Sequence, residues 1–569
     1  MTESVPIRPA QRRPDVQVTL PDGRILAGPI GTRLESFIRA ANLGPVPIMA
    51  ALVNGRLREL THCLHHDAAV EPLSMATSDG MRIYQRSLTF LLVVAAQELY
   101  PGVQIIVDHS ITRGGYFCEV QGRPNFTATE LAQIESRMRE IVNADEPIEH
   151  QHISIEEAIK LFERQGFRDK VRLLRANHNG RTALPLYTLR GVHDYFYGYM
   201  VPSAGYLRFF ALRPAAGGFV LLFPRRDAPT ELPHYTGTSK LTEVFGEHRD
   251  WMRVMGIEDV ASLNDAVANG RMREIILVAE ALHERRVAEI AGKIAAARGK
   301  YRLVLIAGPS SSGKTTFAKR LAVQILAQGG HPVSLGLDDY FVDREKTPRD
   351  EKGDYDFEAL EALNLELFNR QLVELLHGEE VQLPRYNFSA GRSEPGRKLA
   401  LSPEHVILIE GIHGLNPRLV ADVPAGAVFR IYVSALTQLN LDCHNRIPTT
   451  DTRLIRRIVR DAAYRGYSAL KTIANWESVL RGERRYIYPY QDNADEMFNS
   501  ALLYELAVLK PLVEPLLRQI EPHDTSEYIE AHRLLAFLSW FLPSAADAVP
   551  DNSLLREFIG GSSLENFSY

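Results

Sequence analysis

The chain has 569 residues, of which 45% are hydrophobic and 24% charged, with a formal net charge of -5. This length predicts several domains. The chain lacks the strong basic excess of a dedicated nucleic-acid-binding protein, so the charge balance argues against that class. Cys63, Cys118 and Cys443 form no C-x-x-C pair, which argues against a disulfide framework or a cysteine zinc site and favours a reducing cytoplasm. The longest apolar runs fall short of the ~20 residues that span a bilayer, so we expect no membrane anchor.

The first 230 residues predict two small α+β units behind a disordered lead at 1–15. In the first unit, residues 16–85, an alternating run, a Pro-Asp-Gly turn and a second run predict a β-hairpin. A helix is expected next, at 34–41. The second unit, residues 86–230, is expected to contain helices at 87–99, 127–143 and 154–165, and strands between 206 and 223.

The rest of the chain predicts a helical connector at 231–298, an α/β domain at 299–520 and a helical tail at 521–569. Apolar strands alternate with helical segments in the α/β domain, which predicts a parallel sheet with helices on both faces. The expected strands are 303–307, 333–337, 406–409 and 428–433. Because ligands bind at the carboxyl ends of such strands, side chains directly after them are the first site candidates.

The strongest motif follows the first of these strands. Residues 308–315 read Gly-Pro-Ser-Ser-Ser-Gly-Lys-Thr and match the phosphate-binding pattern G-x-x-x-x-G-K-[ST]. Such a loop points backbone N–H groups and a positive helix end at the phosphates of ATP, with Lys314 at the β/γ-phosphates and the Thr315 hydroxyl at Mg²⁺. The predicted cofactor-binding residues are Gly308, Ser310, Ser311, Ser312, Gly313, Lys314, Thr315 and Thr316.

Two carboxylates follow other strands of the predicted sheet. Asp338 comes after the second strand, where it would accept the proton of an acceptor hydroxyl and stand beside the metal. Taken alone, an Asp at this place is more often a helix cap or turn residue. Glu410 follows the next sheet strand and is the second predicted metal neighbour, although one carboxylate at a strand end is also commonly structural.

Four arginines share one face of a predicted helix, at the spacing i, i+3, i+4 and i+7. They are Arg453, Arg456, Arg457 and Arg460. Guanidinium groups arranged in this way suit phosphate oxygens. The alternative is a solvated face paired with neighbouring carboxylates. Beside a phosphate loop we favour the first interpretation.

Taken in order, these motifs resemble the phosphoribulokinase and uridine kinase family from residue 301 to about 520. The resemblance also covers the blocks 338–341, 355–357, 383–388 and 451–457. It implies Asp338 as base and metal neighbour, and Thr315 and Glu410 around Mg²⁺. The residues that it places near the acceptor are Asp356, Tyr386 and Tyr340. It also implies Arg453 and Arg456 as catalytic residues near the phosphates, together with Lys314.

One departure from the family concerns the acceptor. Uridine kinases typically carry a histidine that reads the pyrimidine after the acceptor-side tyrosine, whereas Gly391 holds that place here. A lost polar contact of this kind changes substrate discrimination strongly. The acceptor pocket is therefore open or altered, and uridine or cytidine is the default acceptor.

The front half resembles threonyl-tRNA synthetases: residues 16–85 their ubiquitin-like TGS module and residues 86–230 their editing domain. Editing uses H-x-x-x-H on a helix and a distant C-x-x-x-H, a set suited to zinc or water activation. The corresponding residues here are Phe90, Val94, Phe196 and Met200, so we expect the hydrolytic chemistry to be lost. The resemblance makes RNA a candidate partner.

These observations predict an ATP- and Mg²⁺-dependent cytoplasmic kinase acting on a nucleoside-like small molecule. A nucleotide-switched regulator that binds tRNA or the ribosome is one alternative. A kinase for another acceptor, such as a sugar phosphate or a pantothenate-like alcohol, is the second. A histidine metal cluster at 62–66 is the weaker interpretation of that loop, since such loops are more often exposed and unligated.

Overall fold

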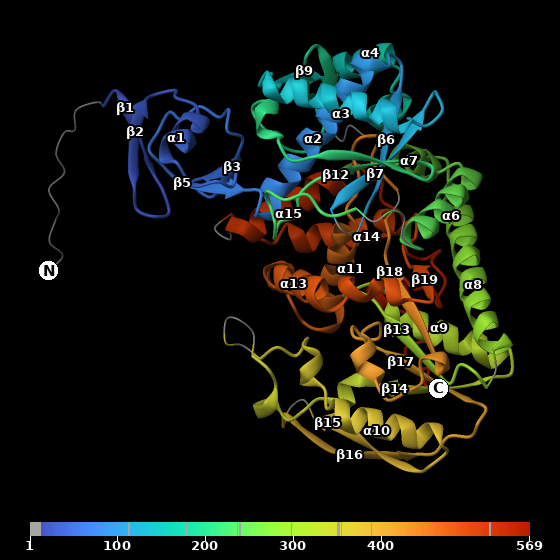
Figure 1. Ribbon diagram of the computed structural model, residues 1–569. Helices are drawn as coiled ribbons and strands as arrows, with labels where there is room; N and C mark the ends of the chain where they lie inside the picture. Colours follow the sequence, from blue (N-terminus) through green and yellow to red (C-terminus); the bar gives the residue numbers. More distant parts are fainter. Residues whose placement is uncertain are drawn as a thin grey trace, which may run out of the picture.

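The computed structural model describes residues 13–111, 114–176, 180–235, 237, 240–297, 299–349, 353, 355–387, 390–437, 439–522 and 525–569. Figure 1 shows three bodies: the N-terminal unit at one side, a second α+β unit, and a large C-terminal α/β body. Of the disordered lead predicted at 1–15, residues 1–12 lie outside the described residues, while Asp15 already begins a strand.

The N-terminal unit is a five-stranded sheet in the order β2-β1-β5-β3-β4, crossed by one helix. The predicted hairpin is confirmed, because β1 and β2 pair antiparallel with Val18 opposite Leu26. The helix α1 begins and ends at the predicted residues. The elements are β1 Asp15–Thr19, β2 Ile25–Pro29, α1 Leu34–Ala41, β3 Ile48–Val53, β4 Arg56–Arg58 and β5 Ala68–Ser74.

The second unit contains a four-stranded sheet, β11-β12-β7-β6, and a three-stranded sheet, β10-β9-β8. Its first helix, α2, runs from Ser78 to Leu99, capped by Thr77, so the domain boundary expected after residue 85 falls inside a continuous helix. The other elements are β6 Gln104–Ser110, β7 Gly115–Gln121, α3 Ala128–Asn143, β8 Glu149–Ser154, α4 Ile155–Gln165, α5 Arg168–Ala176, β9 Ala183–Leu189, β10 Val192–Asp194, β11 Ala211–Ala215 and β12 Gly218–Leu222.

The α/β body has the predicted parallel sheet, with the order β14-β17-β13-β18-β19. Every neighbouring pair in it is parallel. The fifth strand and the antiparallel hairpin β15–β16 were not expected from the sequence. The elements are β13 Leu303–Ala307, α9 Lys314–Ala327, β14 His331–Gly336, α10 Leu365–Leu376, β15 Val381–Asn387, β16 Arg392–Leu399, β17 His405–Glu410, β18 Val428–Ser434, α11 Thr449–Tyr464, α12 Ala469–Ala474, α13 Trp476–Tyr486, β19 Glu496–Asn499 and α14 Glu505–Leu517.

Helices before and after this sheet extend its core. The segment predicted as a connector forms α6 Lys240–Met255, α7 Val260–Ala268 and α8 Met272–Ala296, and α8 packs along α9. The predicted tail contains α15 Thr525–Leu538 and the short α16 Arg556–Ile559. Trp540, Leu554 and Phe558 of the tail are fully buried, so the tail belongs to the core of the α/β body.

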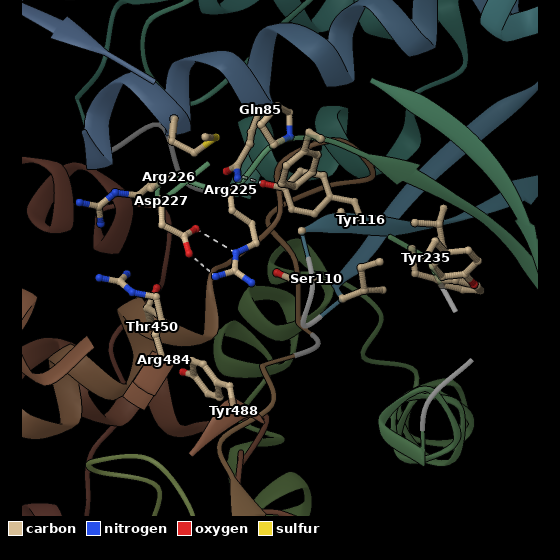
Figure 2. Close-up of a pocket in the computed structure, with 18 of the residues that line it drawn as sticks. Gln85, Ser110, Tyr116, Arg225, Arg226, Asp227, Tyr235, Thr450, Arg484 and Tyr488 are labelled. Carbon is tan, nitrogen blue, oxygen red and sulfur yellow. Dashed lines mark hydrogen bonds and ion pairs between the residues drawn. The ribbon is translucent and has the colours of Figure 1, made fainter. Parts of the chain in front are cut away.

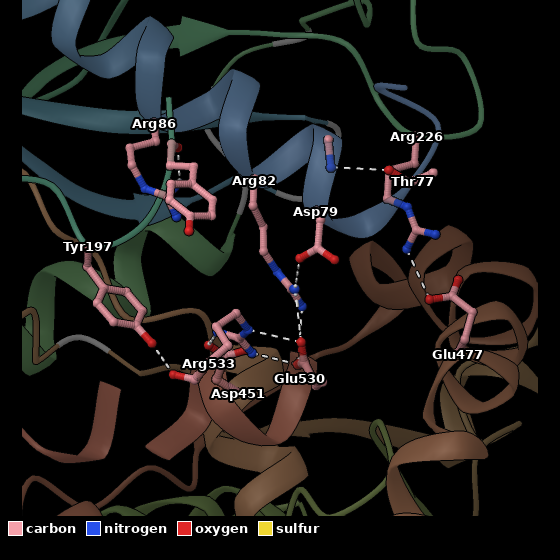
Figure 3. A network of polar contacts seen from close by, with 12 residues as sticks. Thr77, Asp79, Arg82, Arg86, Tyr197, Arg226, Asp451, Glu477, Glu530 and Arg533 are labelled. Carbon is pink, nitrogen blue, oxygen red and sulfur yellow. Dashed lines mark hydrogen bonds and ion pairs between the residues drawn. The ribbon is translucent and has the colours of Figure 1, made fainter. Parts of the chain in front are cut away.

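Charged side chains join the bodies (Figure 3). Arg82 of α2 donates a hydrogen bond to Glu530 of α15 at 3.0 Å. Arg533, also in α15, donates to Asp451 of α11 at 2.6 Å. Deeper in the interface, the buried Lys170 lies 2.8 Å from Asp194 and 3.0 Å from Asp442 of the α/β body. A buried charge with two carboxylate partners fixes the relative placement of the elements that carry them.

Candidate active site

The phosphate-loop motif forms the expected strand-loop-helix. The strand β13 is buried along its whole length, and α9 begins at Lys314 with Gly313 as an N-cap that makes no side-chain bond. Gly308 lies so close to β18 that a Cβ there would come within 1.9 Å of the Val433 carbonyl oxygen. Gly313 has a φ of 82°, a conformation that L side chains rarely adopt. Both glycines are therefore required by the backbone.

Two hydroxyl groups in the loop fit phosphate oxygens. The Ser311 and Ser312 Oγ atoms are buried and lack a hydrogen-bond partner among the described residues. Buried polar groups of this kind are normally paired, and a ligand supplies the partner where the protein does not. Together with the N-terminus of α9 beside them, these hydroxyl groups are donors of the kind that a phosphate group needs.

Lys314, Asp338 and Glu410 line the same cavity of about 1300 Å³. Glu410 ends β17 and stands opposite Gly336 of β14, two residues before Asp338. The Thr315 hydroxyl donates a hydrogen bond to the Glu410 carboxylate at 3.0 Å. The sheet therefore brings a loop lysine, a hydroxyl and two carboxylates to one edge, as the sequence predicted. Oxygen donors of this kind are the ligands that Mg²⁺ prefers.

Burial shifts the titration of the three charged groups. It raises the pKa of Asp338, aided by the neighbouring Asp339 and opposed by Lys314. It raises the pKa of Glu410 in the same way, again opposed by Lys314. It lowers the pKa of Lys314 itself, while Glu410 acts to raise it. A carboxyl group with a raised pKa is a better proton acceptor once it is ionised.

Two of the four arginines do not face the cavity. Arg453 and Arg456 are fully buried. Arg453 forms a bidentate pair with Glu483 at 2.6 and 2.8 Å, and Arg456 bonds to Glu505 at 2.5 Å. That both lie near bound phosphates stays a prediction; in this structure each guanidinium is paired with a carboxylate behind the loop.

Arg453 and Arg456 hold the phosphate loop in place. Arg453 donates to the Ser310 carbonyl at 3.2 Å, and Arg456 donates to the Ser311 carbonyl at 3.4 Å. The Glu483 carboxylate also accepts from the Ser310 N–H at 2.9 Å. The two residues therefore act as positioning residues for the backbone that would receive phosphate.

The other half of the arginine face lies nearer the cavity. Arg457 donates to the Ser310 hydroxyl at 2.7 Å. Arg460 lines the cavity together with Arg465, which the sequence did not single out. Arg460 and Arg465 thus add positive charge to that of Lys314 in this cavity.

The three predicted acceptor residues stand outside the cavity lining. Tyr340 is buried, and its hydroxyl donates to Gln371 of α10 at 2.8 Å, so its predicted substrate contact is wrong. Asp356 accepts from the Tyr486 hydroxyl at 2.8 Å. Tyr386 packs its ring 5.6 Å from that of Phe341, which does line the cavity. Asp356 and Tyr386 thus support the wall of the acceptor side.

Several further residues line the cavity that the sequence did not assign to the site. They are Glu358, His413, and Arg385 and Arg397 of the β15–β16 hairpin; of these, Arg385 lies in the family block 383–388. Burial and the neighbouring Glu483 raise the pKa of Glu358 to about 7. Burial lowers the pKa of His413 to about 4, so this ring is neutral at neutral pH.

Gly391 occupies a crowded turn. A Cβ at this position would come within 2.9 Å of the Arg344 guanidinium carbon, and the φ is 68°. Phe388, the last residue of the family block, and Ser389 lie outside the described residues. A histidine at 391 would therefore need both a strained backbone and a displaced Arg344.

The tail closes one side of the site. Glu557 accepts from the Thr316 N–H at 3.3 Å and from its hydroxyl at 3.0 Å. Lys319 of α9 donates to the Leu564 carbonyl at 2.6 Å, and the Ser334 N–H donates to the Tyr569 carbonyl at 3.1 Å. Phe567, Ser568 and Tyr569 line the cavity. Residues 241 positions apart thus build one site.

The four positions that the sequence aligns with an editing site are packed with apolar side chains. Phe90, Val94, Phe196 and Met200 are each at most 1% exposed, and the Phe90 and Phe196 rings lie 5.4 Å apart. His444 of the α/β body stacks on Phe196 from the other side of the interface, with ring centroids 6.2 Å apart. These positions supply hydrophobic packing where an editing site would hold imidazole and thiol groups.

Comparison with known proteins identifies the domain that carries this site. The model of the Phosphoribulokinase / Uridine kinase family matches residues 303–504. This segment, about a third of the chain, is similar to that family. A solved structure described as a possible uridine kinase from Bacillus stearothermophilus is 22% identical and covers 38% of this chain and 98% of that chain, with a TM-score of 0.27.

The N-terminal part, about 200 residues, is similar to threonine–tRNA ligases. The ligase of Marinobacter nauticus is 35% identical over 204 residues, which are 36% of this chain and 31% of that ligase. The ligase of Acidithiobacillus ferrooxidans is 36% identical over 209 residues, which are 36% of this chain and 32% of that ligase. The chain thus spans about a third of the length of these relatives.

The comparisons and the fold agree on the architecture. The family match falls on the parallel sheet with its phosphate loop, and the ligase match falls on the α+β units before it. Within the described part of the chain, no helix has both the length and the apolar character that crossing a membrane requires.

Proposed function

We propose that the chain is a kinase that uses ATP and Mg²⁺ to phosphorylate a hydroxyl group of a nucleoside-like acceptor, with uridine and cytidine as the first acceptors to test. The observation that carries this proposal is the convergence of Lys314, Thr315, Asp338 and Glu410 on one cavity. The family of residues 303–504 supports phosphoryl transfer as the reaction class.

The geometry supports the following roles. The loop N–H groups and Lys314 would bind the phosphates, and Thr315 and Glu410 would hold Mg²⁺, which would supply positive charge near the transferring group. Asp338 accepts the proton of the acceptor hydroxyl, since it lines the cavity just after the strand that neighbours Glu410. Arg460 and Arg465 face the same cavity as additional positive charges.

A second acceptor class has a specific observation in its favour. Arg385 and Arg397 line the cavity, and Gly391 stands in the place of the histidine that reads a pyrimidine. Two guanidinium groups suit an acceptor that already carries a phosphate, such as a sugar phosphate. The similarity of the front domains to threonine–tRNA ligases keeps an RNA-associated role as the alternative to a purely metabolic kinase.

The test is an ATP-consumption screen across nucleosides, sugar phosphates and sugar alcohols, with the product identified by its mass. Lys314→Ala is the inactive control. Asp338→Asn should lower kcat by about 10²–10⁴, because it removes the proton acceptor and a carboxylate beside the metal. If Asp338→Asn transfers phosphate at the full rate, Asp338 is not the base. If no alcohol is phosphorylated but RNA stimulates hydrolysis, the regulatory alternative holds.

A further inference from the structure

A second large cavity lies between the editing-like unit and the α/β body. Its volume is about 1000 Å³, within the range of small-molecule sites, and none of its lining residues lines the phosphate-loop cavity. Gln85 of α2 and Tyr116 of β7 lie on one side of it, and Thr450, Arg484 and Tyr488 lie on the other (Figure 2). Arg225 and Asp227, from the segment after β12, lie between the two walls.

The lining of this interdomain cavity is basic. Its cations outnumber its carboxylates, which are Asp227 and Asp492. The cationic lining residues are Arg82, Arg225, Arg226, Lys240, Arg446 and Arg484. Clefts lined by one sign of charge concentrate ligands of the opposite sign.

The cationic side chains around the cavity are only partly neutralised by ion pairs with carboxylates. Glu477 accepts from both Arg226 at 3.0 Å and Arg484 at 2.9 Å, so one carboxylate serves two guanidinium groups. Arg225 is paired with Asp227 at 2.9 Å, and Arg82 is paired with Asp79 and Glu530.

Lys240 and Arg446 contribute the excess. Lys240 donates to the Ala494 carbonyl, and Arg446 donates to the Ile447 carbonyl at 3.2 Å. Among the described residues neither one forms an ion pair with a carboxylate. The Nε atom of Arg446 is buried without a hydrogen-bond partner in the described part of the chain. Lys240 and Arg446 are therefore two cations at this cavity that have no carboxylate partner among the described residues.

Aromatic rings accompany these charges. The Arg446 guanidinium lies over the Tyr116 ring, 5.2 Å from its centroid, and Tyr116 meets Phe223 edge-on at 4.8 Å. The Tyr116 hydroxyl donates to the Gln85 side-chain oxygen at 3.0 Å. A stacked arginine, aromatic faces and an amide together suit a flat heterocycle joined to a phosphate.

One helix connects this cavity to the phosphate loop. Tyr488, which lines the cavity, donates from its hydroxyl to Glu483 at 2.9 Å. Glu483 in turn accepts from the Ser310 N–H and pairs with Arg453 behind the loop. Arg484, the next residue of α13, faces the cavity. A ligand that draws Arg484 or Tyr488 toward itself would therefore change the support of the loop.

We propose that the interdomain cavity binds a nucleoside monophosphate, and that its occupancy changes the affinity of the phosphate loop for ATP through Tyr488 and Glu483. The binding part stands without the proposed function; the coupling part rests on it. A coupling of this kind between two sites is reciprocal, so ATP must change the affinity of the cavity ligand by the same factor.

Calorimetric titration of the full chain tests the binding part, with AMP, UMP, inorganic phosphate and uridine as separate probes. The Lys314→Ala variant removes the phosphate-loop site, and a monophosphate should still bind to it. In that background Arg446→Gln should weaken binding by about tenfold, the size of one lost charge-assisted contact. Arg370→Gln, an exposed change on α10, is the matched control and should leave binding unchanged.

Three outcomes would overturn the binding part. They are the absence of monophosphate binding to the Lys314→Ala protein, equal affinity for inorganic phosphate, and a short RNA oligonucleotide that binds the cavity more than tenfold tighter than a monophosphate. The last outcome would assign the cavity to RNA. Equal unfolding midpoints for the Arg446→Gln and Arg370→Gln proteins establish that a loss of binding is not a loss of folding.

The coupling part is tested with a non-hydrolysable ATP analogue, titrated with and without saturating monophosphate. We expect the affinity for the analogue to change about fivefold or more, within the usual range of coupling energies. Tyr488→Phe removes the hydrogen bond to Glu483 and should abolish this change while monophosphate still binds. An unchanged affinity in the wild-type protein overturns the coupling and leaves the binding site standing.

Discussion

The Thr315 hydroxyl donates a hydrogen bond to the carboxylate of Glu410, which ends the strand next to the phosphate loop, at 3.0 Å. Both groups line one cavity, and hydroxyl and carboxylate oxygens are ligands of the kind that Mg²⁺ prefers. The pair also explains why a carboxylate is needed at the end of β17, since it orients the hydroxyl.

Glu410→Gln should weaken the apparent affinity for Mg²⁺ and lower activity by about 10–100-fold, because the amide neither carries the charge nor orients Thr315 in the same way. Activity measured over a range of Mg²⁺ concentrations checks this. Glu404→Gln, at an exposed residue just before the same strand, is the control. An unchanged Mg²⁺ requirement in the Glu410→Gln protein would place the metal elsewhere.

Glu483 gives a prediction about stability. It pairs with the buried Arg453, so Glu483→Gln leaves a guanidinium charge without a counter-ion and should destabilise the fold by about 3–5 kcal/mol. Urea denaturation measures the loss. Adding Arg453→Met should restore part of the stability, because the double variant has no uncompensated buried charge. Full stability with lost activity in the Glu483→Gln protein would instead indicate a direct chemical role.

The strands that position the site were predictable from the sequence, because buried parallel strands are continuous apolar runs. Those at 303–307 and 428–433 match β13 and β18 within one residue. β19 was missed because it has only four residues, Glu496–Asn499, and no longer apolar run. Lys314 was predictable from the phosphate-loop motif, and Asp338 and Glu410 because each lies at or shortly after the end of a strand.

The partners of Arg453 and Arg456 on α11 could not be predicted from the sequence. Helical periodicity places Arg453 and Arg456 on one face, but it does not reveal what covers that face. Their partners Glu483 and Glu505 lie 30 and 49 residues further along the chain. Glu557 is still more distant from Thr316, at 241 residues, and no motif marks it. Contacts of this kind depend on how the helices and the tail pack.

Glu358 predicts a pH dependence of stability. Its pKa is raised to about 7 from 4.5 in the folded protein, mainly by burial. Between about pH 5 and 7 the folded protein therefore holds a proton that the unfolded chain has lost, and stability falls as pH rises through this window. Glu358→Gln cannot ionise and should escape this loss.

Thermal unfolding midpoints at a series of pH values check the effect. The Glu358→Gln protein should gain stability relative to the wild type from about pH 5 upward, and the difference should level off above about pH 7. Glu366→Gln, an exposed change on α10, serves as the control. Parallel midpoint curves for the wild type and Glu358→Gln would show that Glu358 is not held in its neutral form.

We expect that removing the charge of Glu557, in the tail, changes the affinity for ATP. Its carboxylate lies 3.3 Å from the Thr316 N–H, in the first turn of α9, where a phosphate would bind. It also acts to raise the pKa of Lys314, which shows that its charge acts on the same cavity. A negative charge at this place competes with the triphosphate for the helix N-terminus.

Glu557→Gln should therefore tighten ATP binding about two- to fivefold, as expected for roughly 0.3–1 kcal/mol of interaction with the helix end. The amide oxygen still accepts from Thr316, so the tail should stay in place. Equilibrium titration with ATP measures the change, and Glu565→Gln, further along the tail, is the control because its carbonyl rather than its side chain contacts Lys319. Weaker ATP binding in the Glu557→Gln protein would mean that this carboxylate supports the nucleotide, for instance through the metal, and does not compete with it.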